Sequence, residues 1–479
     1  MNDRINRPEL PKGWTWTNLS EISDVNLGKT PNKAQYRNHG DYKIIKFRDI
    51  IGDKIDWDES DRGFVVNSHD LIVQLRELRE RDVLVTASAH SSEHIGKKAV
   101  YVSSIPLNYN EVFFVGELLC IRADEEIVNP RIIYYYIISQ DGYNSIQSHV
   151  RGVHLISSEA RQIGIPLAPL PEQHRIVAKI EELFTKLDAG VEGLKKVKAQ
   201  LKVYRQAVLK HAFEGKLTEE WREAHKGQME SASVLLERIS EERKKSARGK
   251  YKELPILNTS DLPELPEGWV WTRLGEVIEK IALTGKKLKQ SNYQEEGKFP
   301  VIDQGRALIG GYSDKEELEV CCELPVIIFG DHTKVAKFVD FNFIAGADGI
   351  RVMKPQEAFY PKLFYYFIQV IPLPHKGYAR HFQFLEKSLI PLPPLPEQHQ
   401  IVEEIERCFS VADAIEKVVE QSLKQAERLR QSILKRAFKG KLVPQDPTDE
   451  PAEKLLERIR AERARIEAEK KATGKTRRS

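Results

Sequence analysis

The sequence contains an internal duplication, and this feature limits what the chain can fold into more than any other. Four pairs of matching segments define it: LPKGWTWT at 10–17 with LPEGWVWT at 265–272, PLPEQHRIV at 169–177 with PLPEQHQIV at 394–402, AFEGKL at 212–217 with AFKGKL at 437–442, and LLERI at 235–239 with LLERI at 455–459. Each half therefore predicts a variable globular segment, a proline-rich stop, a long helix and a shorter charged helix. Because the helical part keeps its length while the globular part does not, we expect the helices to act as a ruler and the globular parts as interchangeable heads.

The composition is that of a globular protein and excludes several other classes. Of 479 residues, 41% are hydrophobic and 30% are charged, which is far from a disordered composition. No apolar run approaches the ~20 residues of a membrane span, and the N-terminus lacks the apolar core of a signal peptide. The four cysteines include no Cys-x-x-Cys spacing, which favours reduced thiols in a cytoplasmic protein over a zinc or disulfide framework. The net charge of +3 does not by itself argue for nucleic acid.

Each proline-rich motif precedes a predicted long helix. Pro171 and Glu172 place a proline and an acid in the first turn, where both favour a helix start. Apolar residues then recur at steps of three or four, the pattern of a coiled-coil seam, and a helix over 171–213 would be roughly 60 Å long. The predicted packing positions are Ile176, Ile180, Leu183, Leu187, Leu194 and Leu201 in the first helix, and Ile401, Ile405, Ala412, Val419, Ala426 and Ile433 in the second.

Two amphipathic rods of equal length in one chain most simply pack on each other. Because each rod follows a similar head, pseudo-twofold symmetry predicts that they are antiparallel. The alternative is that each rod packs on its own head, but a seam this long favours a partner of similar length.

Both globular segments are predicted to be α+β, with short apolar strands between polar, irregular loops. The loops contain side chains that can read base edges or contact phosphate. In the second head the clusters 330–334 and 377–381 combine such side chains with glycine, which allows close approach to a ligand. The candidate DNA-binding residues are Thr30, Lys33, Lys46 and Arg48 in the first head, and Gln304, His332, Thr333, Lys334, Tyr378, Arg380 and His381 in the second.

Motifs for catalysis and cofactor binding are missing. Gly28-Lys29-Thr30 resembles the end of a phosphate-binding loop, but Ser23 stands where that motif needs glycine. Arg131 interrupts what would otherwise approach an adenine-methyltransferase motif. Asp331 and His332, with Asp340 and Asp348, could be interpreted as a metal site, but structural acids at turns are the favoured explanation. We therefore expect no catalytic residue and no metal in this chain, and a binding and positioning role.

The duplicated motifs resemble those of the specificity subunit of type I restriction-modification enzymes. The resemblance covers nearly the whole chain and rests on the opening Leu-Pro-x-Gly-Trp-x-Trp-Thr, the closing Pro-Leu-Pro-Glu-Gln-His and the Ala-Phe-x-Gly-Lys-Leu helix ends. In the first head, Gly28–Pro31 with Lys46 and Asp49 and the segment 95–97 also resemble family landmarks, as do the segments 303–305, 329–333 and 346–349 in the second. The first head departs from the pattern at Ala89 and inserts a charged loop, Asp70–Asp82.

The resemblance implies an α+β fold with two target-recognition domains separated by two long antiparallel coiled-coil helices. The implied segments are a first recognition domain at 1–170, a central helix at 171–217, a charged helix and linker at 218–262, a second recognition domain at 263–395, a distal helix at 396–442, and a charged C-terminal helix or tail at 443–479.

It also implies a function and partners. Each head would read half of a bipartite, asymmetric site in double-stranded DNA. Two modification subunits would dock along the helices, bring S-adenosylmethionine and methylate adenine N6. Two restriction subunits would use ATP and Mg²⁺. This chain would hold no cofactor and contact no membrane.

Two other hypotheses remain open at the level of sequence. The chain could be a stand-alone nuclease that uses Asp303, Glu323 or Asp331 with Mg²⁺, or a coiled-coil scaffold without a role in nucleic-acid binding.

Overall fold

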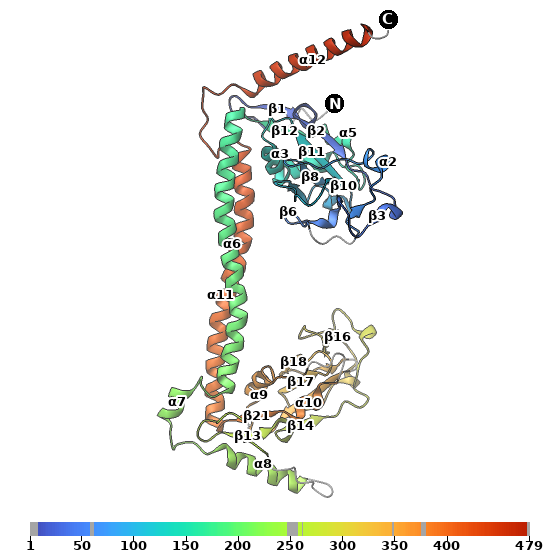
Figure 1. The fold of residues 1–479 in the computed structure, drawn as a ribbon. Coiled ribbons are helices and arrows are strands. Elements are labelled where there is room, and N and C mark those ends of the chain that lie inside the picture. Colours follow the sequence, from blue (N-terminus) through green and yellow to red (C-terminus); the bar gives the residue numbers. More distant parts are fainter. Residues whose placement is uncertain are drawn as a thin grey trace. The chain divides into compact units, whose positions relative to one another are not determined.

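The computed structural model describes residues 8–57, 62–246, 257–260, 262–346, 349–374 and 380–476. The chain divides into two compact units, one of Met1–Gly193 with Gln421–Ser479 and one of Leu194–Glu420. Each unit contains one head and part of both long helices, α6 (Leu170–Phe213) and α11 (Leu395–Ala437) (Figure 1). Among the described residues, no helix combines the length and apolar character that crossing a membrane requires.

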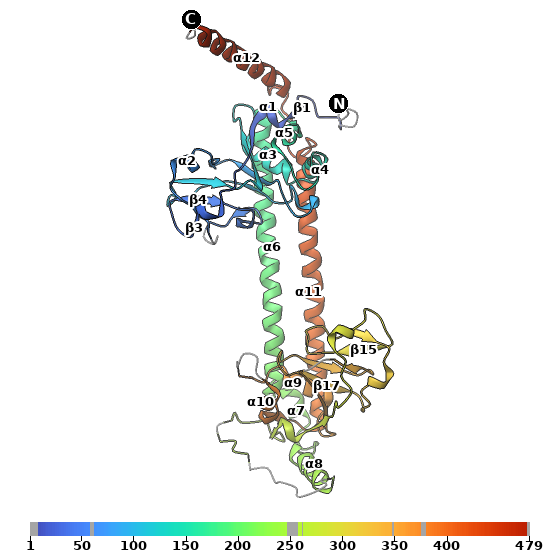
Figure 2. The same cartoon turned by 90° about the vertical axis from the view of Figure 1, so that its right-hand side faces the viewer.

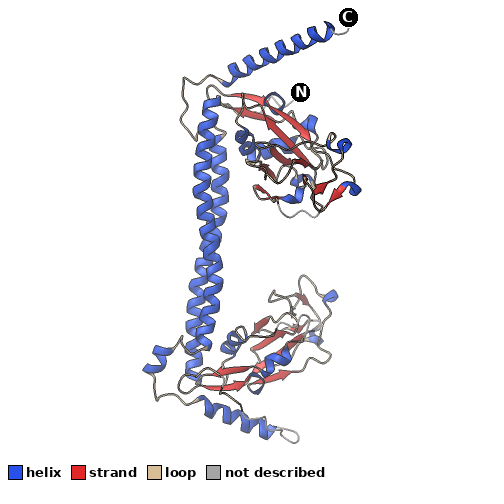
Figure 3. Cartoon of the chain, viewed as in Figure 1, coloured by secondary structure: helices blue, strands red, loops and turns tan. Residues whose placement is uncertain are grey.

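The first head extends from β1 to β12 and contains small sheets with short helices (Figure 3). Its elements are β1 (Thr15–Asn18), α1 (Leu19–Ile22), β2 (Ser23–Leu27), β3 (Tyr36–Arg37), β4 (Tyr42–Ile45), β5 (Ile50–Ile51), β6 (Lys54–Ile55), β7 (Phe64–Val65), α2 (His69–Ile72), β8 (Val83–Thr86), β9 (Ala99–Tyr101), β10 (Glu111–Phe114), β11 (Leu118–Ala123), α3 (Pro130–Ile137), α4 (Gln140–Ser148), α5 (Ser157–Ala160) and β12 (Gly164–Leu167). The larger sheets have the strand orders β2-β11-β8-β9 and β10-β4-β7-β3, in which β4 and β10 are parallel.

The second head repeats this plan with fewer strands. Its elements are β13 (Val270–Arg273), β14 (Ile278–Ile281), β15 (Phe299–Ile302), β16 (Gly311–Ser313), β17 (Val326–Gly330), β18 (Ala336–Val339), β19 (Ile344–Ala345), β20 (Ile350–Pro355), α9 (Pro361–Ile368), α10 (Phe382–Lys387) and β21 (Leu389–Leu392). The order β14-β20-β17-β18 corresponds to β2-β11-β8-β9, and the parallel pair β15 and β19 corresponds to β4 and β10. The predicted α+β class and its internal repeat are confirmed.

Each head meets the long helices through the same joint. In the first unit the joint consists of Tyr135–Phe184, Tyr136–Phe438 and Arg131–Glu181, and in the second of Tyr366–Phe409, Phe367–Phe213 and Lys362–Glu406. All four aromatic pairs are edge-on, with ring centroids 5.2–5.8 Å apart, a geometry that adds specificity to apolar packing. One aromatic pair in each unit joins the head to the long helix that follows it, and the other joins the head to the C-terminal end of the other long helix.

The repeated Pro-Glu-Gln motif binds the opening motif to the helix start. Glu172 Oε2 accepts the Trp14 Nε1–H at 3.1 Å, and Glu397 Oε2 accepts the Trp269 Nε1–H at 2.7 Å. The following glutamines are fully buried, and their amides satisfy three backbone groups in each copy. The backbone partners are Asn129 N, Ile127 O and Ala168 O for Gln173, and Tyr360 N, Ala358 O and Pro393 O for Gln398. The same network forms once in each half of the chain, which explains why the motif occurs twice in the sequence.

The two buried glutamates differ in their partners, which predicts different effects on stability. Glu397 also accepts hydrogen bonds from Thr218 and Arg222, at 2.8 and 2.6 Å. Burial raises the pKa of Glu172, so its ionised form costs stability at neutral pH, and that cost disappears as the pH falls through the folded pKa. We expect Glu397→Gln to lower the stability by about 3 kcal/mol, because it leaves a buried guanidinium without its charged partner.

Glu172→Gln is the matched variant, and it is expected to raise the melting temperature at pH 7. Thermal unfolding of both variants beside the original chain provides the measurement. Equal losses in the two variants would contradict this account of the asymmetry.

The helical segments within each unit run side by side and antiparallel (Figures 1 and 2). In the second unit Arg205 Nη2 pairs with Asp413 at 2.5 Å, and in the first unit Arg430 pairs with Asp188. The second pair corresponds to the first when each residue is shifted by the 225-residue offset of the repeat. In both pairs, and in Lys198–Glu420, the two residue numbers add up to 618, so one antiparallel register holds in each unit.

The seam positions predicted from the sequence are all at least half-buried. Eight are buried and four are half-buried in the structure. The buried ones are Ile176, Ile180, Leu201, Ile401, Ile405, Ala412, Val419 and Ile433, and the half-buried ones are Leu183, Leu187, Leu194 and Ala426. The helix starts also contribute to the cores of the heads, as Ile176 and Ile401 show, so each rod packs both on its partner and on a head.

Charge is segregated along both long helices. Residues 170–193 contain five acidic and three basic side chains, whereas 194–213 contain six basic and no acidic ones. Residues 395–420 contain seven acidic and two basic side chains, whereas 421–437 contain five basic and one acidic. Antiparallel pairing sets each acidic half against a basic half, whereas parallel pairing would oppose like charges. Acid near the N-terminus and base near the C-terminus also suit the helix dipole.

The first turns of a shorter helix pack against each head. In the first unit α12 (Ala452–Thr476) begins where the Ala452 N–H donates to the Gly13 carbonyl at 2.9 Å. In the second unit α8 (Ala232–Ser246), which follows α7 (Glu219–Ala224), begins where the Ala232 N–H donates to the Gly268 carbonyl, also at 2.9 Å. Apolar side chains of both helices are buried in the neighbouring head core: Leu455, Leu456 and Ile459 from α12 are at most 9% exposed, and Ile239 from α8 is 8% exposed. The repeated LLERI motif therefore anchors the start of each shorter helix on a head, and we call each of these two helices a clasp.

Candidate nucleic-acid interface

The candidate residues of the second head gather where the parallel strands β15 and β19 end. The chain leaves β15 into the loop 303–310, and the Gly346 N–H at the end of β19 donates to the Ile302 carbonyl at 2.8 Å. β17 ends beside them at Gly330, which leaves no room for a side chain against Gln304. In open sheets the carboxyl ends of parallel strands are a common place for ligand binding, because several loops converge there.

Gln304 and Thr333 are in direct contact at this edge. The Thr333 hydroxyl donates to the Gln304 carbonyl at 2.7 Å and remains exposed. The side-chain oxygen of Gln304 is buried and accepts no hydrogen bond from the residues that the structure describes. A Cβ placed on Gly349 would lie 2.8 Å from that oxygen and 3.0 Å from the ring of His332, so the three residues form one group. An amide with an unused acceptor can bind a base amino group.

The other predicted residues of this head have different surroundings. The Lys334 Nζ donates to the Pro374 carbonyl at 3.0 Å, with Leu373 as a second acceptor at 3.4 Å, so its charge is directed toward the protein backbone. His381 is 1% exposed, and its Nδ1 lies 3.0 Å from the Asp331 carbonyl. Arg380 is exposed, whereas Tyr378 lies outside the described residues. Lys334 and His381 therefore support the loops, which leaves Arg380 accessible.

The first head gathers its candidates at the corresponding edge, where the parallel strands β4 and β10 end. The Thr30 hydroxyl accepts the Gly116 N–H at 3.0 Å, which holds the segment after β2 against the turn after β10. The Lys46 Nζ donates to the Arg62 carbonyl at 2.6 Å and lies 4.7 Å from the ring centroid of Tyr36.

Two further basic residues of the first head are exposed at the same edge. Lys33 begins the short 3-10 helix Lys33–Gln35, immediately before Tyr36. The Arg48 side chain is 56% exposed beside Asp49, whose pKa is raised by burial. The loop after β4, with Lys46 and Arg48, and the loop after β15, with Gln304, are thus equivalent loops that both carry candidate residues.

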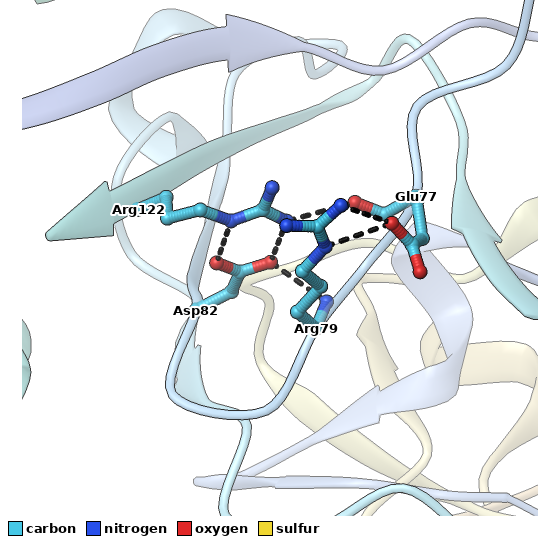
Figure 4. Close-up of polar contacts among 4 residues, drawn as sticks. All are labelled: Glu77, Arg79, Asp82 and Arg122. Carbon is cyan, nitrogen blue, oxygen red and sulfur yellow. Dashed lines mark hydrogen bonds and ion pairs between the residues drawn. The ribbon is translucent and has the colours of Figure 1, made fainter.

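The inserted segment Asp70–Asp82 belongs to the folded head and is not a free charged loop. Its leucines Leu71, Leu75 and Leu78 are buried in the core around β4 and β10. Its last residue, Asp82, is 1% exposed and forms a bidentate pair with Arg122, with both N–O distances 2.7 Å (Figure 4). The Arg79 N–H also donates to Asp82, which fixes the loop on β11. Sequence reasoning noted the charges here, but the leucines between them decide the structure.

The carboxylates of the nuclease hypothesis have structural partners. Asp331 accepts the Phe382 N–H at 2.8 Å, Asp303 accepts the Gly305 N–H at 2.8 Å, and Glu323 pairs with Lys354. Within the part of the chain that the structure describes, three or more potential ligand side chains do not come together as a metal site. Asp348 lies outside that part.

Several residues that sequence reasoning missed belong to these edges. Lys337 donates a hydrogen bond to the loop after β15, and Lys98 donates one to the end of the loop after β4. Arg306 and Leu308 are exposed at the tip of the loop 303–310. The flanking glycines Gly305 and Gly310 were the available signal for a projecting loop after a strand.

The family model for the type I restriction modification DNA specificity domain matches this chain twice, over residues 11–201 and 266–425. The matched ranges include both heads and most of both long helices. The two matches reproduce the internal duplication seen in the sequence and in the joints.

Two related proteins match over nearly the whole length. The chain is 26% identical to the StySPI type I restriction enzyme specificity subunit of Salmonella potsdam, covering 96% of this chain and 97% of that protein. It is also 26% identical to the EcoKI specificity subunit of Escherichia coli K12, covering 95% and 97%. A chain solved in a study of complex assembly and conformational transition of the type I restriction-modification system has a similar fold, with a TM-score of 0.60 and 19% identity over 91% of this chain and all of that one.

Proposed function

Since this chain belongs to the family of type I restriction-modification specificity subunits, we propose that it reads a bipartite, asymmetric DNA site, one half with each head. The observation that carries the proposal is the pair of equivalent edges, at the ends of β4 and β15, that present different side chains on the same frame. Arg48 stands on the first loop, and Gln304 on the second. Equivalent joints with unequal heads would produce a site whose two halves differ in sequence, because protein symmetry is mirrored in half-site arrangement.

We further propose that the chain positions catalytic partners and does not itself catalyse. Two modification subunits would bring S-adenosylmethionine and methylate adenine N6, and two restriction subunits would use ATP and Mg²⁺, all in the cytoplasm. The donor chemistry of the heads supports this division, because the carboxylates of Asp303, Glu323 and Asp331 are already engaged by internal donors.

The surface of the long helices supports docking of two similar partners. Tyr204 and Leu429 occupy equivalent positions in the repeat, and they are 43% and 49% exposed. Helices in water normally turn such residues inward, so an exposed pair at matching positions suits a partner that binds once to each unit. The second unit also exposes Val411, Ile415 and Val418 along one face of α11, which adds apolar area on that side.

The test is methylome sequencing of cells that express the cognate modification subunit with or without this chain. We expect N6-methyladenine at one split sequence, present only when both proteins are made. The purified chain alone is expected neither to transfer methyl groups from S-adenosylmethionine nor to cleave DNA with Mg²⁺. Methyl transfer by the isolated chain, or an unchanged methylome in its absence, would contradict the proposal.

A further inference from the structure

A lysine supports the DNA-facing loop in each head. In the first head the Lys98 Nζ, just before β9, donates to the Ile50 carbonyl at 2.9 Å, where the loop after β4 ends. In the second head the Lys337 Nζ, in β18, donates to the Leu308 carbonyl at 3.3 Å in the loop after β15. β9 and β18 are the corresponding outer strands of corresponding sheets. The arrangement therefore recurs although the two loops differ in length and sequence.

The support is most developed in the second head. Lys337 is 4% exposed, and its Nζ lies 3.5 Å from Asp303 Oδ1, so a charged pair sits beneath the loop. Burial lowers the pKa of Lys337, which shows that its charge is held there at some cost. Asp303 in turn accepts the Gly305 N–H at 2.8 Å, which closes the start of the loop.

Three glycines surround the Asp303 side chain and make this packing possible. A Cβ on Gly310 or Gly346 would lie 2.7 Å from Asp303 atoms, and one on Gly305 would lie 3.0 Å away. Both ends of the loop, together with the end of β19, are thus packed around a single carboxylate. A loop held in this way keeps its tip in one place, which is the requirement for reading a base by a short contact.

The tip presents two side chains outward. Arg306 is exposed, and its guanidinium forms no hydrogen bond or ion pair with another described residue. Leu308 is 46% exposed, although its carbonyl is tied down to Lys337. An arginine can bind guanine O6 and N7 with two donors, and an apolar side chain beside it can contact a thymine methyl group or a base step.

We propose that Lys337 is a positioning residue for DNA recognition: it holds the loop 303–310 so that Arg306 and Leu308 read the half-site of the second head, and Lys98 does the same for the loop after β4. This inference rests on the proposed function. Lys337 itself does not contact DNA, because its charge is enclosed by Asp303 and the loop backbone.

The experiment uses the full complex with the modification subunit and measures methylation rates on duplexes that differ by one base pair in one half-site. Lys337→Met combined with Asp303→Asn removes both charges but keeps an acceptor for Gly305, so the fold is retained. We expect the rate on the best duplex to fall by about 5- to 150-fold, the range for one lost base contact, with weaker discrimination in the second half-site only. Lys98→Met should show the same effect in the first half-site only. Arg306→Ala should weaken discrimination at one base pair of the second half-site.

Lys315→Met, at an exposed lysine of the same head, is the matched control and should behave like the original chain. Thermal unfolding of each variant distinguishes a loss of folded protein from a loss of discrimination between DNA sequences. A folded double variant that keeps full rate and discrimination would overturn the inference, because Lys337 would then only stabilise the head. If the original complex itself shows no sequence preference, the proposed function fails and the inference fails with it.

Discussion

Insertion of four residues into each long helix, after Lys196 and after Gln421, is expected to widen the gap between the methylated half-sites by one or two base pairs. The two insertion points are equivalent in the repeat and opposite each other in the antiparallel register, since their neighbours also obey the sum of 618. The ion pairs that follow this register, Arg205–Asp413, Lys198–Glu420 and Asp188–Arg430, are therefore preserved. Four residues add about one helical turn, roughly 6 Å, and leave the seam nearly in phase. DNA rises about 3.4 Å per base pair, which sets the expected change.

The half-site sequences should stay the same, because neither recognition edge is altered. Methylome sequencing reports the gap and the half-sites together. Insertion in α6 alone is the control: it shifts α6 against α11 by one turn, and we expect it to reduce activity by misaligning pairs such as Arg205–Asp413. An unchanged gap with full activity after the double insertion would show that the helices do not set the spacing.

Termination of the chain after Val443 is expected to unfold the first head while the second head stays folded. The deletion removes Leu455, Leu456 and Ile459 from the core of the first head. Burial of each is worth about 1.5–3 kcal/mol, so the total of roughly 5–9 kcal/mol approaches the whole stability of a domain. The deletion also removes the ion pair of Arg460 with Glu21, at 2.6 Å.

A chain that ends at Arg465 retains all of these contacts and is the matched control. Limited proteolysis followed by mass spectrometry would locate the unfolded region in each variant. Cleavage confined to the first head is the expected result. Resistance of the first head in the chain that ends at Val443 would show that α12 is only an accessory.

The duplication made the frame predictable because matching motifs imply matching contacts. Segments 10–17 and 265–272 proved to lie beside the glutamates of the proline-rich motifs, where Trp14 and Trp269 donate to them. The seam was readable because a repeat of three and four residues is a local signal. The role of the glutamate was not readable, since an acid in the first helical turn predicts a dipole interaction and says nothing of a buried indole.

The recognition edges were less predictable because they depend on contacts between distant parts of the chain. Lys334 and Lys337 are three residues apart and chemically alike, yet one donates to the segment 373–374 and the other to the loop after β15. Arg380 and His381 are adjacent in the sequence, yet Arg380 is exposed and His381 is buried. Sequence alone identifies donors near glycine, whereas strand pairing over tens of residues decides which of them face outward.

The segregation of charge along the long helices has a consequence for how such a chain could arise. A helix that is acidic in its first half and basic in its second is complementary to an antiparallel copy of itself. A gene for one head, one such helix and one clasp would therefore give a homodimer with the same joints and the same register. Its two identical heads would read a palindrome. Duplication and fusion of that gene would free the heads to diverge without any change in the frame, and a palindromic target would become an asymmetric one.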